Sequence, residues 1–403
     1  MDRETVDTLL TGMLQSAEGI SDLLFISGKP PLVEIHGRLS QFTGSGLTPL
    51  FIEQLADHII DGSERLKVEF TTTGSCDCSY AIENLARFRV NIFRQNGKHA
   101  VVMRKLQSEV PTLEKLGLPP IFREIVKEKN GIVLVTGGTG TGKTTTLAAM
   151  LNELNLTEEI HIVTLEDPIE FFHYHGKAAI SQRELNKDFH SFAEGLRAAL
   201  RQAPKAILVG EIRDPETLEI AMTASETGHI VFSTLHTINA GQTINRIIGM
   251  FPREEEQQLR LRLSESLRYV ISQRLVNKIE GGRLLVTEIM GNNLRTRETI
   301  IYGESENKTF NEIIEAGSTQ GWHSFDQSLL AAYQSSNVTE ETVMLSCTNK
   351  GRVRRELDLI QKRNGTASVQ APSGLKLNIP EPIRIIDEDA IPFSSPPPFP
   401  AKR

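Results

Sequence analysis

The 403-residue sequence is short of cysteine and of long apolar runs, and each shortage excludes a class of protein. Three cysteines, Cys76, Cys78 and Cys347, cannot form a disulfide framework, and an odd count suits a reducing cytoplasm. The longest apolar runs, residues 132–135 and 206–209, are too short to span a bilayer. No basic segment followed by an apolar one begins the sequence, so no signal peptide is expected. We therefore expect a cytoplasmic protein.

The sequence also has no excess of basic residues over acidic ones. The net charge is −7, so the chain as a whole is not drawn to nucleic acid or to an anionic membrane. The interleaved aromatic and basic residues of a single-strand groove are not seen either, and no nucleic-acid partner is expected. The 39% hydrophobic and 24% charged residues are typical of a soluble globular protein, long enough for two or three domains.

The first 110 residues have the pattern of a small α+β domain. A helix is predicted at residues 3–16 and a hairpin at 86–103, where Asn96-Gly97 is a strong two-residue turn signal. Along the first hairpin strand Phe88, Val90 and Ile92 alternate with polar residues, which indicates a half-buried antiparallel strand. Two shorter strands are predicted at 23–26 and 33–35.

From about residue 121 buried β-branched runs alternate with helical stretches. Strands are predicted at 132–136, 160–165, 206–209 and 230–235, and this rhythm predicts a parallel sheet with helical crossovers. After about residue 296 the pattern is helical, with helices predicted at 310–316, 325–335, 339–347 and 353–362. Residues 364–403 are proline-rich and are predicted to form a flexible tail.

The clearest chemical signature is GGTGTGKTTTL at residues 137–147. It has the phosphate-loop spacing Gly-x4-Gly-Lys-Thr between a predicted strand and a predicted helix, a context that argues against a mere glycine-rich turn. Its backbone N–H groups can surround a phosphate, Lys143 can reach the β- and γ-phosphate oxygens, and the Thr144 hydroxyl can bind Mg²⁺. We predict an ATP and Mg²⁺ site made by Gly137, Gly138, Thr139, Gly140, Thr141, Gly142, Lys143, Thr144 and Thr145.

Two predicted strands end in acids that hydrolysis would need. One leads into Glu166, and the other into Gly210 and Glu211. In a doubly wound sheet the carboxyl ends of the strands face the ligand. The second strand resembles a Walker B with Gly210 at the usual aspartate position, which leaves Glu211 as the acid beside the metal. Glu166 is then predicted to orient the attacking water. The alternative is that both are surface acids at strand ends.

Two histidines, His229 and His236, flank the last predicted strand of the parallel sheet. They are seven residues apart, so a continuous strand points them to opposite faces and a shared metal site is disfavoured. A histidine at the end of a strand can sense phosphate through a ring N–H. An ordinary core or loop histidine is the alternative.

Three segments, TLEDPIE (164–170), ILVGEIRD (207–214) and TGHIVFSTLHT (227–237), resemble the Asp box, Walker B and His box of the secretion ATPase superfamily. With the phosphate loop they form four ordered motifs, and the resemblance extends from about Ser21 to Ile360. It implies an α/β fold with a smaller α+β, PAS-like N-terminal domain (1–110), a RecA-like P-loop ATPase domain (111–295), and a helical C-terminal part (296–363). It also implies a homo-hexameric ring.

Within that superfamily the chain is similar to the twitching-motility retraction ATPases. It lacks the tetracysteine zinc module usual in pilus-assembly and type II secretion ATPases, and TINRIIGMFP (243–252) and GWHSFDQSLLAAYQ (321–334) match the retraction branch. The resemblance implies an ATP hydrolase that drives type IV pilus retraction. It further implies a place at the cytoplasmic face of the inner membrane, through a pilus platform protein, with a paralogous retraction ATPase as a further partner.

The predicted hairpin also carries several arginines. Arg87 and Arg89 share its polar face and Arg104 ends the returning strand. In the family, arginines of this hairpin approach the nucleotide between domains or subunits. We therefore predict Arg89 and Arg104 as arginine fingers, which stabilise the charge of phosphoryl transfer. A solvated basic face is the alternative.

Three other functions remain open. The first, pilus assembly or protein secretion, would use the same chemistry. The second, a RecA-like nucleic-acid motor, is disfavoured by the charge. The third, a nucleotide-gated scaffold that does not hydrolyse ATP, is disfavoured because Glu166 and Glu211 are both present.

Overall fold

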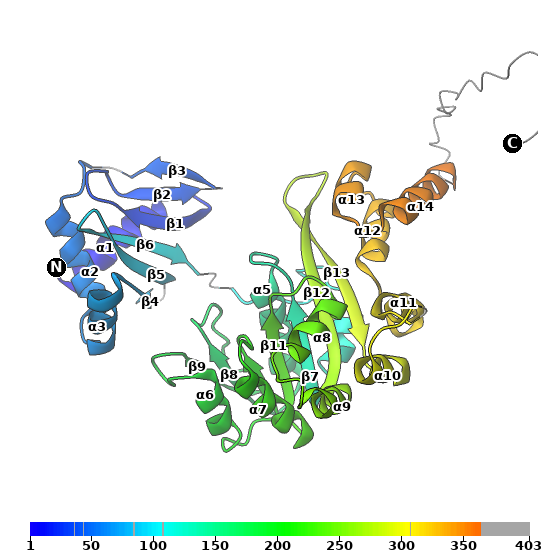
Figure 1. Cartoon of the computed structure of the whole chain (residues 1–403). Helices are drawn as coiled ribbons and strands as arrows, with labels where there is room; N and C mark the ends of the chain where they lie inside the picture. The colour runs from blue at the N-terminus through cyan, green and yellow to red at the C-terminus, as the bar shows by residue number, and fades with distance from the viewer. Residues whose placement is uncertain (36, 43, 84, 107–108, 307, 364–403) are drawn as a thin grey trace, which may run out of the picture. The chain divides into compact units, whose positions relative to one another are not determined.

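The computed structural model describes residues 1–35, 37–42, 44–83, 85–106, 109–306 and 308–363, so the predicted tail lies outside the described residues. Within them Met1–Glu356 belongs to one compact unit, which contains two β-sheets (Figure 1). The fold is the α/β class that the sequence predicts, with a seven-stranded sheet, a six-stranded N-terminal sheet and C-terminal helices. The domain boundaries proposed above stay predictions.

The N-terminal sheet is antiparallel and has the order β3-β2-β1-β6-β5-β4. Asn96 (φ 49°) and Gly97 (φ 71°) form the β5–β6 turn with positive φ at both positions, as their sequence predicts. Side chains alternate along β5, with Phe88, Val90 and Ile92 buried in the core. The elements are α1 (Arg3–Gln15), β1 (Ile20–Phe25), β2 (Leu32–Ile35), β3 (Arg38–Gln41), α2 (Pro49–Ile60), α3 (Glu64–Thr73), β4 (Ser75–Ile82), β5 (Ala86–Gln95) and β6 (Lys98–Lys105).

The second sheet has the order β13-β12-β7-β11-β10-β8-β9. All neighbours in it are parallel except β12 and β13, which form a long antiparallel hairpin at one edge. The four predicted parallel strands are confirmed, and β7, β10 and β11 are buried along their whole length. The strands are β7 (Gly131–Thr136), β8 (His161–Glu166), β9 (Ala179–Glu184), β10 (Ala206–Val209), β11 (Ile230–Leu235), β12 (Leu267–Asn277) and β13 (Arg283–Gly291).

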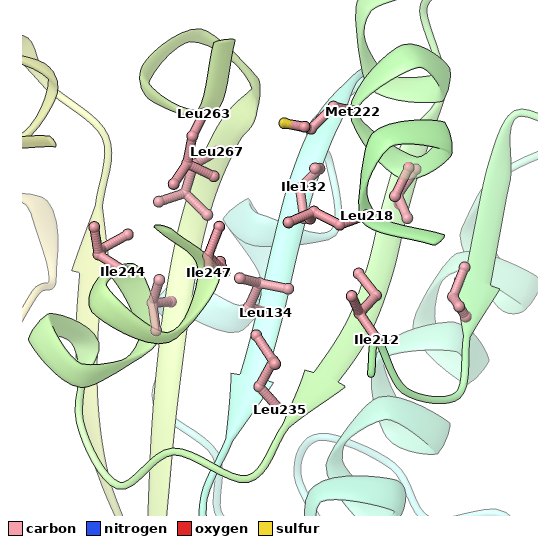
Figure 2. Packing of buried hydrophobic residues seen from close by; sticks show 14 of the residues in the cluster. Ile132, Leu134, Ile212, Leu218, Met222, Leu235, Ile244, Ile247, Leu263 and Leu267 are labelled. Carbon is pink, nitrogen blue, oxygen red and sulfur yellow. The ribbon is translucent and has the colours of Figure 1, made fainter. Parts of the chain in front are cut away.

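Helices connect the parallel strands and cover the sheet. Figure 2 shows the packing on one face, where Ile132 and Leu134 of β7 lie among side chains such as Leu218, Ile247 and Leu263 from three covering helices. The burial of these apolar side chains is the main stabilising contribution to this layer. The helices of this region are α4 (Ile121–Ile125), α5 (Lys143–Thr157), α6 (Phe192–Ala199), α7 (Pro215–Glu226), α8 (Ala240–Ile248) and α9 (Glu256–Ser266).

The helical C-terminal part follows the β12–β13 hairpin. The four helices predicted there are confirmed to within a few residues, and α10 precedes them. Trp322, the only tryptophan of the chain, is 4% exposed. A Cβ on Gly291 or Gly317 would come within 2.4 or 2.3 Å of its indole ring, so both glycines make room for it. The helices are α10 (Leu294–Tyr302), α11 (Phe310–Ala316), α12 (Phe325–Gln334), α13 (Glu340–Ser346) and α14 (Lys350–Arg363).

Candidate nucleotide site

The predicted phosphate loop joins the buried strand β7 to helix α5. Gly142, at the N-cap of α5, has φ +88°, a conformation that suits glycine, and α5 begins at Lys143. Thr144 and Thr145 therefore lie in the first helical turn, where free backbone N–H groups create a positive potential. Between strand and helix the loop consists of Gly137, Gly138, Thr139, Gly140, Thr141 and Gly142. The sequence-predicted residues are thus arranged for anion binding.

Gly137 is the most constrained residue of the loop. Its φ is +147°, and a Cβ there would lie 2.6 Å from the Thr141 hydroxyl and 2.7 Å from the Gln273 carbonyl oxygen. The Thr141 hydroxyl itself donates to the Gly138 carbonyl at 2.9 Å. Glycine at position 137 therefore lets the loop close tightly against β12.

Gly210 explains the departure from the usual Walker B pattern. Its N–H donates to the Leu165 carbonyl at 2.8 Å, where β10 leaves β8. A Cβ at this position would lie 3.1 Å from that same oxygen, and 3.6 Å from the Glu166 Cα. This close approach of the chain after β10 to the end of β8 favours glycine at position 210. The acidic residue of the motif is therefore found one position later, at Glu211.

Lys143, Glu211 and His236 share one electrostatic environment. The Lys143 ammonium donates to the carbonyls of Gly137 (2.9 Å) and Gly138 (3.0 Å). Burial lowers the pKa of Lys143, while the charges of Glu211 and Glu170 oppose that shift. His236 Nε2 lies 3.8 Å from Glu211 Oε2, and burial and the Lys143 charge lower the pKa of His236. Three elements, β7, β10 and β11, thus bring their carboxyl ends to one place, as the sequence predicts.

Glu166 lies at the end of β8 and is 8% exposed. Its Oε1 accepts hydrogen bonds from the Thr164 hydroxyl at 2.6 Å and from Gln182 Nε2 at 3.1 Å. Burial raises the pKa of Glu166 to about 7, and these two hydrogen bonds limit the shift. A carboxyl group of that pKa can exchange protons near neutral pH. Its described hydrogen-bond partners, however, belong to β8 and β9.

Glu170 is a site residue that the sequence reasoning did not assign. Burial raises the pKa of Glu170, while the Thr144 hydroxyl and the charges of Arg89, Arg104 and Lys143 act against the shift. The signal was present in the sequence, because Glu170 is the last residue of the Asp-box segment TLEDPIE.

The two predicted arginine fingers are paired across the hairpin, since Arg89 lies opposite Arg104 in the β5–β6 register. Arg104 is 70% exposed and its Nε donates to Asp22 at 2.9 Å. Both charges act on Glu170 of the same chain. Arg87 contacts the segment that follows β8, since it donates to the Ile169 carbonyl at 2.9 Å and its guanidinium lies 3.9 Å from the Phe172 ring centre.

The structure does not bring His229 to the phosphate loop. It precedes β11, at the amino end of the strand, whereas His236 follows the carboxyl end. Its Nδ1 lies 2.9 Å from the Ala224 carbonyl and 3.2 Å from the Thr227 hydroxyl. A role for His229 in the reaction stays a prediction.

In the described part of the chain no group of three His, Cys, Asp or Glu side chains converges to hold a metal ion. Cys76 is buried and Cys78 is half-buried, both as free thiols. Among the described residues, no helix has the length and apolar character needed to cross a membrane.

A glycine loop between a buried parallel strand and a helix, with an acid at the end of another strand of the same sheet, defines a P-loop nucleoside triphosphatase. The family described as "Type II/IV secretion system protein" matches residues 78–281. Together with the relatives below, that match shows that the chain belongs to this family of secretion ATPases. The predicted resemblance is confirmed, and the chain is a nucleotide-binding ATPase.

Two relatives and one solved structure extend over most of the chain. The type IV pilus retraction ATPase PilT of Pseudomonas aeruginosa is 43% identical over 313 residues, which cover 77% of this chain and 90% of that protein. The type IV pilus ATPase PilU of the same organism is 33% identical over 91% of this chain and 95% of its own. A crystal structure of the pilus retraction motor PilT with bound ADP superposes with a TM-score of 0.77 at 38% identity, covering 87% of this chain and 98% of that one.

Proposed function

We propose that this chain is a hexameric, Mg²⁺-dependent ATPase motor that drives type IV pilus retraction, and so twitching motility. The observation that carries the proposal is the meeting of Lys143, Glu211, His236 and Glu170 at one edge of the parallel sheet. Similarity to PilT and PilU along most of their lengths supports the choice of pilus retraction over other work that such a site could drive.

ATP would bind with its phosphates in the loop. The Lys143 ammonium would exchange the Gly137 and Gly138 carbonyls for β- and γ-phosphate oxygens, and the first turn of α5 would supply backbone N–H groups. Thr144 and Glu211 offer the hard oxygen ligands that Mg²⁺ prefers, and this ion commonly takes one or two protein ligands together with phosphates. When bound, it would neutralise charge on the phosphate oxygens.

The two Asp-box glutamates divide the remaining work. The Thr144 hydroxyl and the Lys143 charge both act on Glu170, which places it beside the predicted metal position, and we assign to it the orientation of the attacking water. Glu166, which the sequence suggested for that role, is held by Thr164 and Gln182. Glu170→Gln should keep nucleotide binding but lower kcat about a hundredfold or more, the usual scale for a lost general base. A larger loss in Glu166→Gln than in Glu170→Gln would restore the first assignment.

The proposed partners follow from the same relatives. We propose a homo-hexamer that works in the cytoplasm and is held at the inner membrane by a pilus platform protein, together with a paralogous retraction ATPase. The arginines of the β5–β6 hairpin would complete the charge around the γ-phosphate.

The test combines an enzyme assay with a cell assay. Phosphate release from ATP by the purified protein should require Mg²⁺ and disappear in Lys143→Ala. In the host, deletion of the gene should leave cells with more surface pili and no twitching, and only the wild-type gene should restore motility. Loss of pili on deletion would instead indicate an assembly motor, and unchanged pili and motility would contradict the proposal.

A further inference from the structure

Gln182 of β9 spans the segment that follows β8. Its Nε2 donates to Glu166 Oε1 at 3.1 Å and to the Phe171 carbonyl at 2.8 Å, while its Oε1 accepts from the His173 backbone N–H at 2.9 Å. The amide nitrogen and the amide oxygen of this one side chain therefore hold Glu166, Phe171 and His173. No described hydrogen bond connects Gln182 to the phosphate loop itself.

Glu184, two residues further along β9, makes a fourth hydrogen bond to the chain that follows β8. Its Oε2 accepts from the Ile169 backbone N–H at 3.3 Å, and the residue is 6% exposed. Residues 182 and 184 lie on the same face of β9, because side chains alternate along a strand. The segment is thus held at the backbone of Ile169, Phe171 and His173, which are every second residue.

The residues between these held positions have their contacts elsewhere. Glu170 faces the phosphate loop, where Thr144 and Lys143 act on its carboxylate, and Phe172 is 44% exposed and lies against Arg87. Residues 169–173 therefore lie along β9 as an extra strand would, but they are hydrogen-bonded to the side chains of β9 rather than to its backbone. Pro168, which has no N–H, could not contribute a donor to an ordinary ladder.

We propose that Gln182 and Glu184 are positioning residues for ATP hydrolysis, which hold the Asp-box segment so that the carboxylate of Glu170 faces Thr144. The proposal rests on the role given above to Glu170. A displacement of about 1 Å of a catalytic group can cost about a hundredfold in rate. Gln182 supplies two of the three described hydrogen bonds from β9 side chains to residues 169–173, so its loss would free the part of the segment that follows Glu170.

Gln182 is the better residue to change, because Glu184 also accepts from the Ser79 hydroxyl at 2.8 Å and pairs with Arg87 at 3.5 Å. Gln182→Leu removes all three hydrogen bonds. Gln182→Glu keeps the size and the acceptor for His173 but loses both donors. Ser181→Ala is the matched control, since it lies on the opposite face of the same strand.

The experiment measures kcat and KM for ATP in the assembled enzyme, with ATP binding and ring mass as checks of folding. Both Gln182 variants should lower kcat by about tenfold to a hundredfold, with KM changed less than about threefold, and Ser181→Ala should match wild type. Added to Glu170→Gln, the Gln182→Glu change should cause no further loss, because both act through one group.

Wild-type kcat in Gln182→Glu would overturn the positioning role, as would an additive loss in the double variant. Failure of the assignment to Glu170 looks different, because Glu170→Gln would then hydrolyse ATP at the wild-type rate. If Gln182→Leu does not assemble, the isosteric Gln182→Glu variant still decides the question.

Discussion

Glu166 and Glu170 are four residues apart, yet their surroundings differ. Glu166 ends a strand and is enclosed by β8 and β9, whereas Glu170 lies in the following segment and reaches the first turn of α5. An enclosed carboxyl group with few donors is held in its protonated form to higher pH than one in water. The two glutamates should therefore differ in what a change of pH or an amide substitution does to them.

The first prediction concerns stability and pH. Burial raises the pKa of Glu166 from 4.5 to about 7, so its contribution to stability is complete below about pH 4.5 and is lost as the pH rises through 7. A glutamine at position 166 cannot ionise, so the Glu166→Gln variant does not lose stability in this way as the pH rises. The free energy of unfolding of the variant, relative to wild type, should rise between pH 4.5 and 7 by about 3 kcal/mol. Urea unfolding at several pH values measures it, with the exposed Glu194→Gln as control, and a pH-independent difference would contradict it.

The second prediction concerns the backbone of the phosphate loop. Gly137→Ala adds a methyl group between the Thr141 hydroxyl and the Gln273 carbonyl, at a backbone conformation of φ +147°. The affinity for ATP should fall about a hundredfold or more, which corresponds to about 3 kcal/mol. Gly140→Ala is the control, because that position also has positive φ (+76°) but no atom within 4 Å of an added Cβ. Equal losses in both variants would mean that only backbone strain matters.

At the level of elements, the chain divides into parts that sequence can and cannot predict. Four of the parallel strands were predictable because each is a short run of buried apolar, largely β-branched residues next to a turn. The β12–β13 hairpin was not assigned, because half-buried positions interrupt its apolar pattern. Lys143 and Glu211 were found from local motifs. The placement of Glu170 was not, because it depends on side chains of β9, a strand that the sequence analysis did not assign.

The third prediction concerns the turn between α13 and α14. The buried carboxylate of Asp326, on α12, accepts from the backbone N–H groups of Thr348 (2.6 Å) and Asn349 (2.9 Å). Asp326→Ala leaves both donors without this partner and should destabilise this region by about 1–3 kcal/mol. ATP affinity should stay unchanged, because no residue of the phosphate loop is involved. Amide hydrogen exchange at Thr348 and Asn349 is the measurement.

The exposed Glu341→Ala on α13 is the matched control for that variant. It removes a carboxylate from the neighbouring helix without touching the turn. Unchanged exchange at both amides in Asp326→Ala would show that the carboxylate is not needed there. Equal acceleration in both variants would point to a general loosening of the C-terminal helices.

At the scale of the whole molecule, the question is whether a subunit completes its own active site. The charges of Arg89 and Arg104 act on Glu170 of the same chain, against the rise of its pKa, and this favours an arginine supplied by the same subunit. A ring ATPase can also borrow its arginine from a neighbour. The two arrangements differ in what happens when damaged subunits are mixed.

The fourth prediction is that rings mixed from Lys143→Ala and Arg104→Ala subunits stay inactive. Each subunit then lacks one part of its own site, and no neighbour can replace it. Native mass measurement should confirm mixed rings, and wild type mixed with Lys143→Ala serves as the control for subunit exchange. A partial return of phosphate release would contradict the prediction and would show that Arg104 acts on the adjacent subunit. The same mixture made with Arg89→Ala tests the other arginine.

Trp322, the only tryptophan in the sequence, can serve as an intrinsic fluorescence probe. Trp322 is enclosed between Gly291, at the end of β13, and Gly317, just after α11, so its fluorescence comes from a single, defined junction of the fold. The phosphate loop touches the same sheet at Gln273 of β12, the strand paired with β13. A shift in emission when nucleotide is added would therefore time, without any label, how quickly a change at the phosphates reaches the C-terminal helices.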